Sequence, residues 1–430
     1  MKRGVKMARI LLLFVHTHII TFFSKDWNRW KRKQDHSTMS VSMISLSEEQ
    51  NTAIDAIIHW FEHETKVKRF ITLGGYAGTG KTTVVAALRN KLHEKNKKLK
   101  IAFVSYTGKA TRVLQSKLIQ TKEIYKADSV STIHSLIYTP IVNEREEIVG
   151  WKKKESLECD LIIIDEASML DSMIWGDIYS YDIPIIAIGD HGQLPPIQGN
   201  FSLMAKTDLM LSKIHRQAQE NPIIGLSIQA REHGYIRPGR YSEFVKKYTP
   251  EDPDFQMEMQ EVFENYNSDT LILCGYNNTR KRLNQTIRNA LGFDMSEPSS
   301  GDRVICLRNN HEHHIYNGMI GTISEIVPKG DQWYEAEIQI DDGDIYNGRI
   351  SKEQFGSDTA LNFTDKRSKI MAGDLFDFGY ALTVHKAQGG QARKVVLFEE
   401  RFKKMDENQW RRWLYTAVTR AEEELIIFGT

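Results

Sequence analysis

Residues 70–82 read FITLGGYAGTGKT, and this stretch indicates what kind of fold to expect. Phe70–Leu73 is a short apolar run bounded by glycine, which predicts a buried strand, and Thr82–His93 follows with helical spacing. Between them, Gly75–Thr82 matches the pattern GxxxxGK(S/T), which is informative where it joins a strand to a helix. Glycines there let backbone N–H groups turn around phosphate oxygens, and the helix N-terminus adds a favourable dipole. The stretch therefore predicts a phosphate-binding loop in an α/β sheet; a chance glycine turn is the weaker alternative.

This loop predicts a site for ATP and Mg²⁺. Lys81 should reach the β- and γ-phosphates, and the hydroxyl of Thr82 should hold Mg²⁺. The loop residues that we expect to contact the nucleotide are Gly75, Ala77, Gly78, Thr79, Gly80, Lys81, Thr82 and Thr83.

The run Leu161–Glu166 supplies a natural partner for the loop, because four apolar residues precede two carboxylates. This pattern predicts a strand with Asp165 at its carboxyl end, where ligands bind in parallel sheets. Asp165 should coordinate Mg²⁺, and Glu166 should polarise the attacking water. Alone, such a run is often a strand that meets solvent, but its pairing with the phosphate loop favours the functional interpretation.

Alternating strand and helix patterns extend on both sides of the loop. The apolar runs Ile101–Ser105 and Ile183–Gly189, with a helical pattern at Lys109–Leu118, predict a doubly wound parallel sheet. A second set begins near Thr270. Its expected strands and helix are Leu271–Cys274, Val395–Phe398, the helix Gln409–Glu424 and the closing strand Leu425–Phe428.

Two β-rich inserts interrupt these α/β sets. Around 299–371, the alternating run Trp333–Ile340 is followed by Asp342-Gly343, a strong hairpin signal, so we expect a small β-barrel. Tyr138–Lys154 reads as a β-hairpin with a charged turn at Asn143–Glu147. The predicted fold class is α/β: two P-loop-type domains with parallel sheets, a β-hairpin insert and a β-barrel insert.

Length and composition describe an ordinary globular chain. Its 430 residues, 41% of them hydrophobic, allow about three folding units. Three scattered cysteines without CxxC spacing fit a reducing interior and argue against a secreted scaffold or a zinc site. The net charge of +1 combines +7 in residues 1–43 with −6 in residues 44–430. Nucleic-acid binding by the acidic body would therefore need a local groove.

The first 43 residues differ from the rest. Ile10–Phe23 is mostly apolar but shorter than the roughly 20 residues that span a bilayer. Three interpretations stay open: an untranslated stretch before a true start at Met43, a disordered or docking tail, and a membrane or export signal. We expect a cytoplasmic protein without a membrane segment.

Phosphoryl transfer benefits from an arginine supplied by a second domain, worth roughly 10³–10⁵ in rate. Two candidates follow the first α/β set: Arg216 in Ile214–Gln217, and Arg420 in Thr416–Ala421. Pattern alone leaves either one open as a surface residue.

Eight stretches, in this order, resemble the motifs of superfamily 1 helicases of the RecD/Dda type, from about Leu46 to the C-terminus. Two departures stand out: Tyr106 occupies a position where the family usually has proline, and Gln391 lies where many relatives carry an acidic residue. The matching stretches are Leu46–Gln50, Tyr106–Ala110, Ser131–Ser135, Asp165–Ser168, Gly189–Pro196, Arg216, Thr383–Gly389 and Arg420, besides the phosphate loop.

The resemblance implies an ATP-dependent DNA helicase that moves 5′→3′ along single-stranded DNA in replication, recombination or repair. It assigns adenine recognition to Gln50 and γ-phosphate sensing to Gln193. The implied catalytic residues are Lys81, Asp165, Glu166, Gln193, Arg216 and Arg420. The implied DNA contacts are Thr107, Lys109, His134, Thr383, His385 and Lys386.

The resemblance also names the predicted domains. Residues 44–210 would form a first RecA-like domain with a pin-like insert at 138–156, after an extension at 1–43. Residues 211–298 and 372–430 would form a second RecA-like domain, with an SH3-like insert at 299–371. The expected partners are single-stranded and forked DNA, together with single-strand-binding or replication proteins. We expect the protein to be a monomer.

Other functions stay open at this point. A P-loop kinase would use the phosphate loop but leave the later arginine motifs unexplained. A translocase or loading factor could use ATP without strong unwinding. Action on RNA is the third alternative. No residue in the sequence identifies a contact to the 2′-hydroxyl that distinguishes RNA from DNA, so DNA is preferred only by the family resemblance.

Overall fold

The computed structural model describes residues 46–142, 148–196, 201–215, 220–294, 297–308, 310, 313, 315–341, 343–357, 361 and 373–430. The predictions for residues 1–43, for the hairpin tip and for Arg216 lie outside this part of the chain. Within it, no helix is both long and apolar enough to cross a bilayer.

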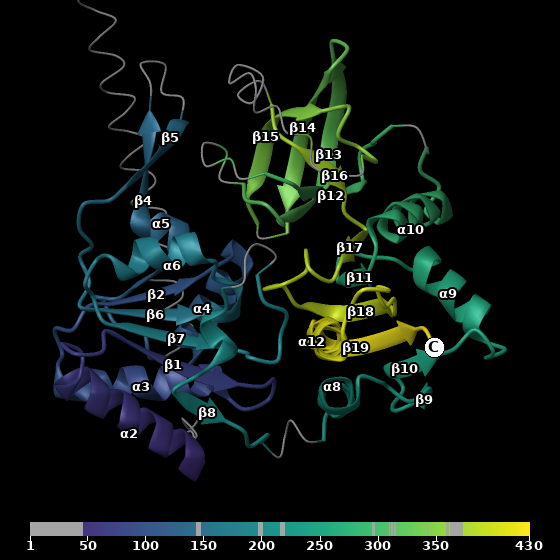
Figure 1. Ribbon diagram of the computed structural model, residues 1–430. Coiled ribbons are helices and arrows are strands. Elements are labelled where there is room, and N and C mark those ends of the chain that lie inside the picture. The colour runs from purple at the N-terminus through teal and green to yellow at the C-terminus, as the bar shows by residue number, and fades with distance from the viewer. Residues whose placement is uncertain are drawn as a thin grey trace, which may run out of the picture. The chain divides into compact units, whose positions relative to one another are not determined.

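A six-stranded parallel sheet carries the phosphate loop, as predicted (Figure 1). Its strand order is β3-β2-β6-β7-β1-β8, so β1 lies between β7 and β8. The strands are β1 (Phe70–Gly75), β2 (Ile101–Ser105), β3 (Ser129–Thr132), β6 (Leu161–Asp165), β7 (Ile185–Gly189) and β8 (Leu209–Leu211).

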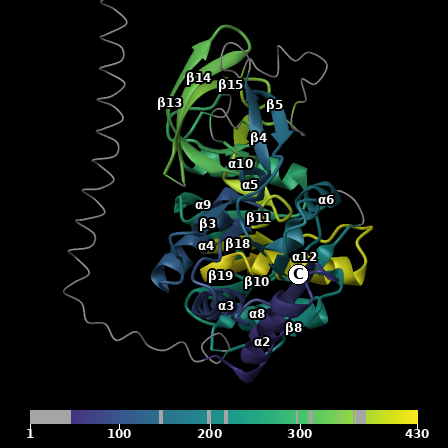
Figure 2. The same cartoon turned by 90° about the vertical axis from the view of Figure 1, so that its left-hand side faces the viewer.

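The apolar runs make this sheet because every one of them is buried. Residues of β2, β6 and β7 are almost without solvent exposure, as expected for a parallel sheet that is covered on both faces. The helix α2 packs against α3 and β8 (Figure 2). The helices of this part are α2 (Glu48–His63), α3 (Lys81–Lys95), α4 (Gly108–Gln120), α5 (Ile133–Ile137) and α6 (Ser172–Tyr179).

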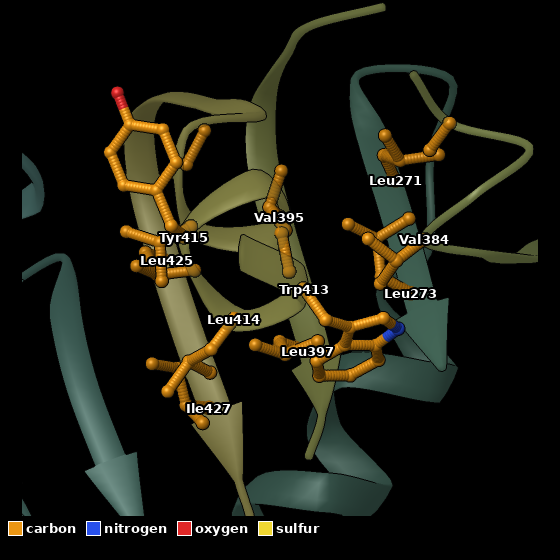
Figure 3. Packing of buried hydrophobic residues seen from close by; sticks show 14 of the residues in the cluster. Leu271, Leu273, Val384, Val395, Leu397, Trp413, Leu414, Tyr415, Leu425 and Ile427 are labelled. Carbon is orange, nitrogen blue, oxygen red and sulfur yellow. The ribbon is translucent and has the colours of Figure 1, made fainter. Parts of the chain in front are cut away.

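A second sheet has the order β17-β11-β18-β19-β10-β9, parallel except for the edge strand β9. Its core packs Trp413 and Leu414 of α12 against Leu397 and Ile427 (Figure 3). The strands are β9 (Gly239–Arg240), β10 (Val245–Tyr248), β11 (Thr270–Cys274), β17 (Ala381–Thr383), β18 (Ala392–Phe398) and β19 (Ala421–Phe428). The helices are α8 (Pro222–His233), α9 (Phe255–Glu264), α10 (Asn277–Ala290) and α12 (Glu407–Val418).

The predicted helix Gln409–Glu424 is wrong at its C-terminal end. The helix α12 ends at Val418, and Ala421 already pairs with Ala392 of β18. The run of three glutamates at 422–424 favours helix by intrinsic propensity, but pairing of β19 with β18 and β10 decides its conformation.

The predicted β-barrel is not confirmed. The insert forms a sheet in the open order β15-β14-β13-β12-β16, and between the described residues of its edges one isolated bridge joins Ile350 to Asp374. The predicted strand Trp333–Ile340 is confirmed. The strands are β12 (Arg303–Cys306), β13 (Ile320–Lys329), β14 (Trp333–Ile340), β15 (Ile345–Ser351) and β16 (Phe376–Phe378).

The predicted hairpin insert is confirmed. β4 (Tyr138–Val142) pairs with β5 (Ile148–Lys153) in an antiparallel ribbon, in which Tyr138 lies opposite Lys153. We call the part of the chain that forms the first six-stranded sheet and its helices the first sheet domain. Tyr181 of this domain holds the base of the ribbon, because its hydroxyl donates to the carbonyl oxygens of Ile137 and Lys154, both at 2.9 Å.

Candidate functional site

The phosphate loop leaves β1 and closes on the first turn of α3. Gly78 and Gly80 have φ values of +79° and +78°, a backbone conformation that side chains disfavour. A Cβ atom on Gly80 would also lie 2.4 Å from Nε2 of Gln50. The Nζ of Lys81 donates to the carbonyl oxygens of Gly75 at 2.8 Å and Tyr76 at 3.1 Å. Lys81 therefore lies over the loop, where a phosphate would meet both its charge and the backbone N–H groups.

Asp165 and Glu166 stand at the carboxyl end of β6. Glu166 has a φ of +54°, a strained value for a residue with a side chain. Burial raises the pKa of both carboxyls; the charge of Asp165 raises that of Glu166 further, while Lys81 opposes each shift. The Oε2 atom of Glu166 is buried and has no hydrogen-bond partner among the described residues. A buried polar atom without a hydrogen bond destabilises the folded state unless a ligand or a water molecule binds to it.

These groups line one pocket of about 380 Å³, here named the phosphate-loop pocket. It brings together ten of the predicted site residues. One of them, Arg420, comes from the part of the chain that forms the second six-stranded sheet and its helices, here called the second sheet domain. They are Ala77, Gly78, Gly80, Lys81, Thr82, Thr83, Asp165, Glu166, Gln193 and Arg420.

Arg420 follows α12 and is 2% exposed. Its guanidinium donates to the carbonyl oxygens of Thr416 and Gly390, both at 3.0 Å, and this anchors it to the second sheet domain. Its charge opposes the rise in the pKa of Glu166. Arg216 lies outside the described residues, so its predicted role stays a prediction.

The residues for Mg²⁺ fit that ion by their chemistry. Thr82 offers a hydroxyl and Asp165 a carboxylate, which are hard oxygen ligands of the kind that Mg²⁺ prefers. Both line the pocket together with Lys81 and Glu166, whose Oε2 atom has no hydrogen-bond partner among the described residues.

Three predicted nucleotide contacts, Gln50, Gly75 and Thr79, do not line the pocket. The Nε2 atom of Gln50 donates to the carbonyl oxygen of Thr79 at 3.1 Å and lies 2.7 Å from Nε2 of His215. Thr79 supports the loop through its own hydroxyl, which donates to Tyr76. Adenine recognition by Gln50 stays a prediction.

A set of hydrogen bonds that the sequence did not reveal holds the loop after β7. The Tyr415 hydroxyl donates to Oδ2 of Asp190 at 2.5 Å and accepts from the N–H of Ala77 at 2.8 Å. Tyr415 belongs to α12, so this hydroxyl of the second sheet domain links the phosphate loop to Asp190, which follows β7 of the first sheet. Burial and Asp190 raise the pKa of Tyr415 well above its ordinary value, so it stays a donor. Its position directly before Thr416–Ala421 was the available signal.

Three further bonds hold the neighbouring residues. Thr416 accepts from the N–H of Leu194 at 2.9 Å, and Gln388 donates to the carbonyl oxygen of Leu194 at 2.8 Å. Arg412 donates to the carbonyl oxygen of Gln193 at 3.2 Å. Gln193 is thus held by its neighbours, while its Oε1 atom is buried without a partner among the described residues.

A second pocket of about 480 Å³ adjoins the first, since Gly389 lines both. It contains four of the predicted DNA contacts, namely Thr107, His134, His385 and Lys386. Thr383 does not line it: the residue is 8% exposed, and its carbonyl oxygen accepts from the N–H groups of Lys386 and Ala387. The side chain of Lys109 lies outside the described part.

Burial sets the charge in this second pocket. It lowers the pKa of His134, of His385 and of Lys386. Burial therefore favours the neutral form of both histidines. The predicted contacts are less cationic than their residue types suggest.

Other features have structural roles. Trp410 and Trp413 stack with centroids 5.2 Å apart in the core. Nδ1 of His313 lies 2.9 Å from Asp374, and no metal-binding cluster occurs among the described residues. Lys152 and Lys153 pair with Glu155 and Asp177.

This geometry defines a class of protein: a P-loop nucleotide-binding protein with two mainly parallel sheets that both contribute to one pocket. The sequence comparisons agree. An AAA domain matches residues 61–199, and a UvrD-like helicase C-terminal domain matches residues 378–428.

Curated relatives extend the match over most of the chain. It is 24% identical to the ATP-dependent RecD2 DNA helicase of Deinococcus radiodurans over 90% of this chain and 49% of that protein. It is 25% identical to the RecBCD enzyme subunit RecD of Buchnera aphidicola over 85% of this chain and 71% of that protein. The chain thus spans about half the length of the Deinococcus relative. The crystal structure of a Bacteroides Pif1 helicase with ADP-AlF3 and single-stranded DNA superposes with a TM-score of 0.49 at 17% identity, covering 90% of this chain and 92% of that one.

The predicted resemblance to superfamily 1 helicases of the RecD/Dda type is confirmed by the two domain matches and these relatives.

Proposed function

We propose that this chain is an ATP-driven motor that moves along single-stranded DNA, in the 5′→3′ direction, and separates duplex DNA ahead of itself. One observation carries the proposal: the phosphate-loop pocket receives Lys81, Asp165 and Glu166 from the first sheet domain and Arg420 from the second. A second pocket that shares Gly389 with it offers a place for the strand. Direction is inferred from the family resemblance alone.

Each residue has a distinct part in the proposed hydrolysis. Lys81 and the loop N–H groups would hold the phosphates, while Thr82 and Asp165 would hold Mg²⁺, which supplies charge neutralisation when bound. Glu166 would orient and deprotonate the attacking water through the buried oxygen that has no partner among the described residues. Arg420 would stabilise negative charge that develops in the transition state.

Coupling to movement would come from the two-sided pocket. A triphosphate that interacts with Arg420 as well as Lys81 favours the closed state by the difference in its affinity for closed and open states. Hydrolysis removes that difference and lets the sheets separate. If the grip on the strand alternates between the two sheet domains, each cycle advances the protein.

Forked DNA with either a 5′ or a 3′ single-stranded tail tests the proposal. We expect ATP-dependent strand separation with the 5′ tail and little with the 3′ tail. DNA-stimulated ATP hydrolysis without strand separation on either fork would indicate a translocase or loading factor. ATP turnover that is insensitive to DNA but yields a phosphorylated small molecule would overturn the motor and favour a kinase. The same assay with a forked RNA of the same sequence measures whether the protein separates RNA strands as well as DNA strands.

The hairpin β4–β5 offers a separate prediction. Its tip, residues 143–147, lies outside the described residues, while its base is held by Tyr181. Shortening the tip should lower unwinding of a forked substrate by several-fold more than translocation on single-stranded DNA. An equal loss of both activities would argue that the hairpin is only structural.

A further inference from the structure

The phosphate-loop pattern GxxxxGK(S/T) leaves its second position open, and in this chain a tyrosine, Tyr76, stands there. Its ring packs against the hydrophobic cluster that forms the core of the second sheet domain. That cluster includes Leu226 and Ala230 of α8, the helix that packs against α12 (Figure 1). One side chain of the phosphate loop is therefore anchored in the second sheet domain.

A cation from α8 lies over this ring. The guanidinium carbon of Arg231 is 3.8 Å from the centre of the Tyr76 ring, within the distance at which a cation is attracted to an aromatic face. The side chain of Arg231 is 19% exposed, so water screens this contact only in part. Arg231 also donates to Oε1 of the exposed Glu232 at 3.0 Å. It does not line the phosphate-loop pocket, so it contacts the nucleotide site through Tyr76.

The loop after β7 leaves room for the ring at Gly192. A Cβ atom on this glycine would lie 2.8 Å from Cε1 of Tyr76, closer than Cβ atoms approach other side chains. The ring of His191 lies next to that of Tyr76, with centroids 4.2 Å apart at 51°. Tyr415 of α12 adds an edge contact, with ring centroids 5.9 Å apart at 78°. Both sheet domains therefore hold the Tyr76 ring in place.

The backbone of Tyr76 connects this ring to the groups that hold the loop together. Its carbonyl oxygen accepts from Nζ of Lys81 at 3.1 Å and from Oγ1 of Thr79 at 2.8 Å. A shift of the Tyr76 residue therefore moves an acceptor that both side chains use. These contacts form a continuous path from Arg231 of α8 to the amine of Lys81.

We propose that Tyr76 and Arg231 are positioning residues for the nucleotide: they hold the phosphate loop to α8 and thereby slow the release of ADP. The inference rests on the proposed function and names a residue pair that sets how long the product stays bound. A nucleotide between Lys81 and Arg420 leaves as the two sheet domains separate. The contact between Tyr76 and Arg231 joins the same two domains, so it has to break in that separation and adds to its barrier.

The first experiment measures the dissociation of ADP directly. The protein is loaded with Mg²⁺ and N-methylanthraniloyl-ADP, a fluorescent ADP, and is mixed with excess unlabelled ADP in a stopped-flow instrument. Y76L removes the aromatic face, and we expect dissociation about 10-fold faster, which corresponds to about 1.4 kcal/mol of barrier. Y76F keeps the ring, so its rate should lie within twofold of that of the unmodified chain.

Three outcomes of this experiment decide the matter. A rate for Y76L that is unchanged within twofold, or slower, would overturn the inference and leave the motor proposal standing. A rate for Y76F as fast as that for Y76L would also overturn it, because the ring would then not be the group that acts. If the unmodified chain did not bind the labelled ADP, the proposed function itself would fail.

The second experiment tests whether the two residues act as a pair. R231Q should also raise the rate about 10-fold, and Y76L/R231Q should be no faster than either single variant, because one contact can be lost only once. A double variant clearly faster than both single variants would show independent effects and overturn the pair. Thermal unfolding of each variant separates faster release from lost folding.

Glu232 supplies the matched control. E232Q removes the carboxylate charge beside Arg231 and leaves the ring in place. Its rate should stay within twofold of that of the unmodified chain, because an exposed ion pair contributes little. A rate for E232Q as fast as that for R231Q would overturn the assignment of the effect to the Tyr76 ring.

Discussion

The two pockets share Gly389 but are built from opposite chemistry. The phosphate-loop pocket places Lys81 and two carboxylates at fixed strand and helix ends, with Arg420 facing them. The second pocket contains tyrosines, and it contains two histidines and a lysine whose pKa values are lowered by burial. If the protein is the motor that we propose, the two pockets have separate tasks: the first holds one ligand still for chemistry, and the second holds another ligand that is passed along.

The largest expected effect comes from removing the central charge of the first pocket. K81A should lower DNA-stimulated ATP hydrolysis by at least about 10²–10³-fold, the loss typical of one preorganised electrostatic contact. The affinity for single-stranded DNA without nucleotide should stay within twofold, because Lys81 does not line the second pocket. A matching fall in strand affinity would show that the two pockets are not separable; unchanged turnover would contradict the assignment of the site.

Tyr415 tests whether the first pocket depends on a contact from the second sheet domain. Y415F keeps the buried ring but leaves Oδ2 of Asp190 and the N–H of Ala77 without this partner. An unsatisfied buried group costs about 1–3 kcal/mol, so we expect kcat for ATP hydrolysis to fall roughly 10-fold. Steady-state kinetics at saturating DNA measures it. An unchanged kcat would make the hydroxyl merely structural.

Gln388 tests the connection between the pockets. It lines the second pocket and donates to the carbonyl oxygen of Leu194, next to Gln193 of the first. Q388L removes a bond worth about 1 kcal/mol, so the ratio of DNA-stimulated to basal ATP turnover should fall about fivefold. The exposed Gln260 of α9 supplies a matched control, Q260L, with the ratio expected to stay constant. Equal ratios in both variants would argue against coupling through this bond.

The smallest expected effect concerns pH and the second pocket. Burial lowers the pKa of His134, opposed by Asp171, and of His385. Because the shift favours the neutral form of both side chains, strand affinity at constant ionic strength should change less than twofold as the pH rises from 7 to 8. Histidines that gripped phosphate as cations would instead lose affinity as the pH rises through their pKa values. If anisotropy showed such a decline, the histidines of the second pocket would bind the strand as cations, and the second pocket would rely on charge as the first pocket does.

Local pattern predicted the elements whose residues are close in sequence. The phosphate loop, β6 with its two carboxylates, and the strand β14 follow from apolar runs and glycine positions. The predicted helix was wrong at residues 419–424, because strand pairing determines the conformation from Ala421 onward. It was not confirmed for the barrel, because closure of a sheet depends on pairings between distant strands.

The sequence by itself determined which chemistry is possible: the glycine loop, the lysine and the acidic strand end act within a few residues of one another, so their pattern is visible in one dimension. The tertiary structure alone decided which distant groups meet and in what state. The Tyr415 hydroxyl reaches the N–H of Ala77 across 338 positions, and burial lowers the pKa of His134 and of His385. The physical reason is that hydrogen-bond partners and desolvation depend on neighbours in space, which no local pattern contains.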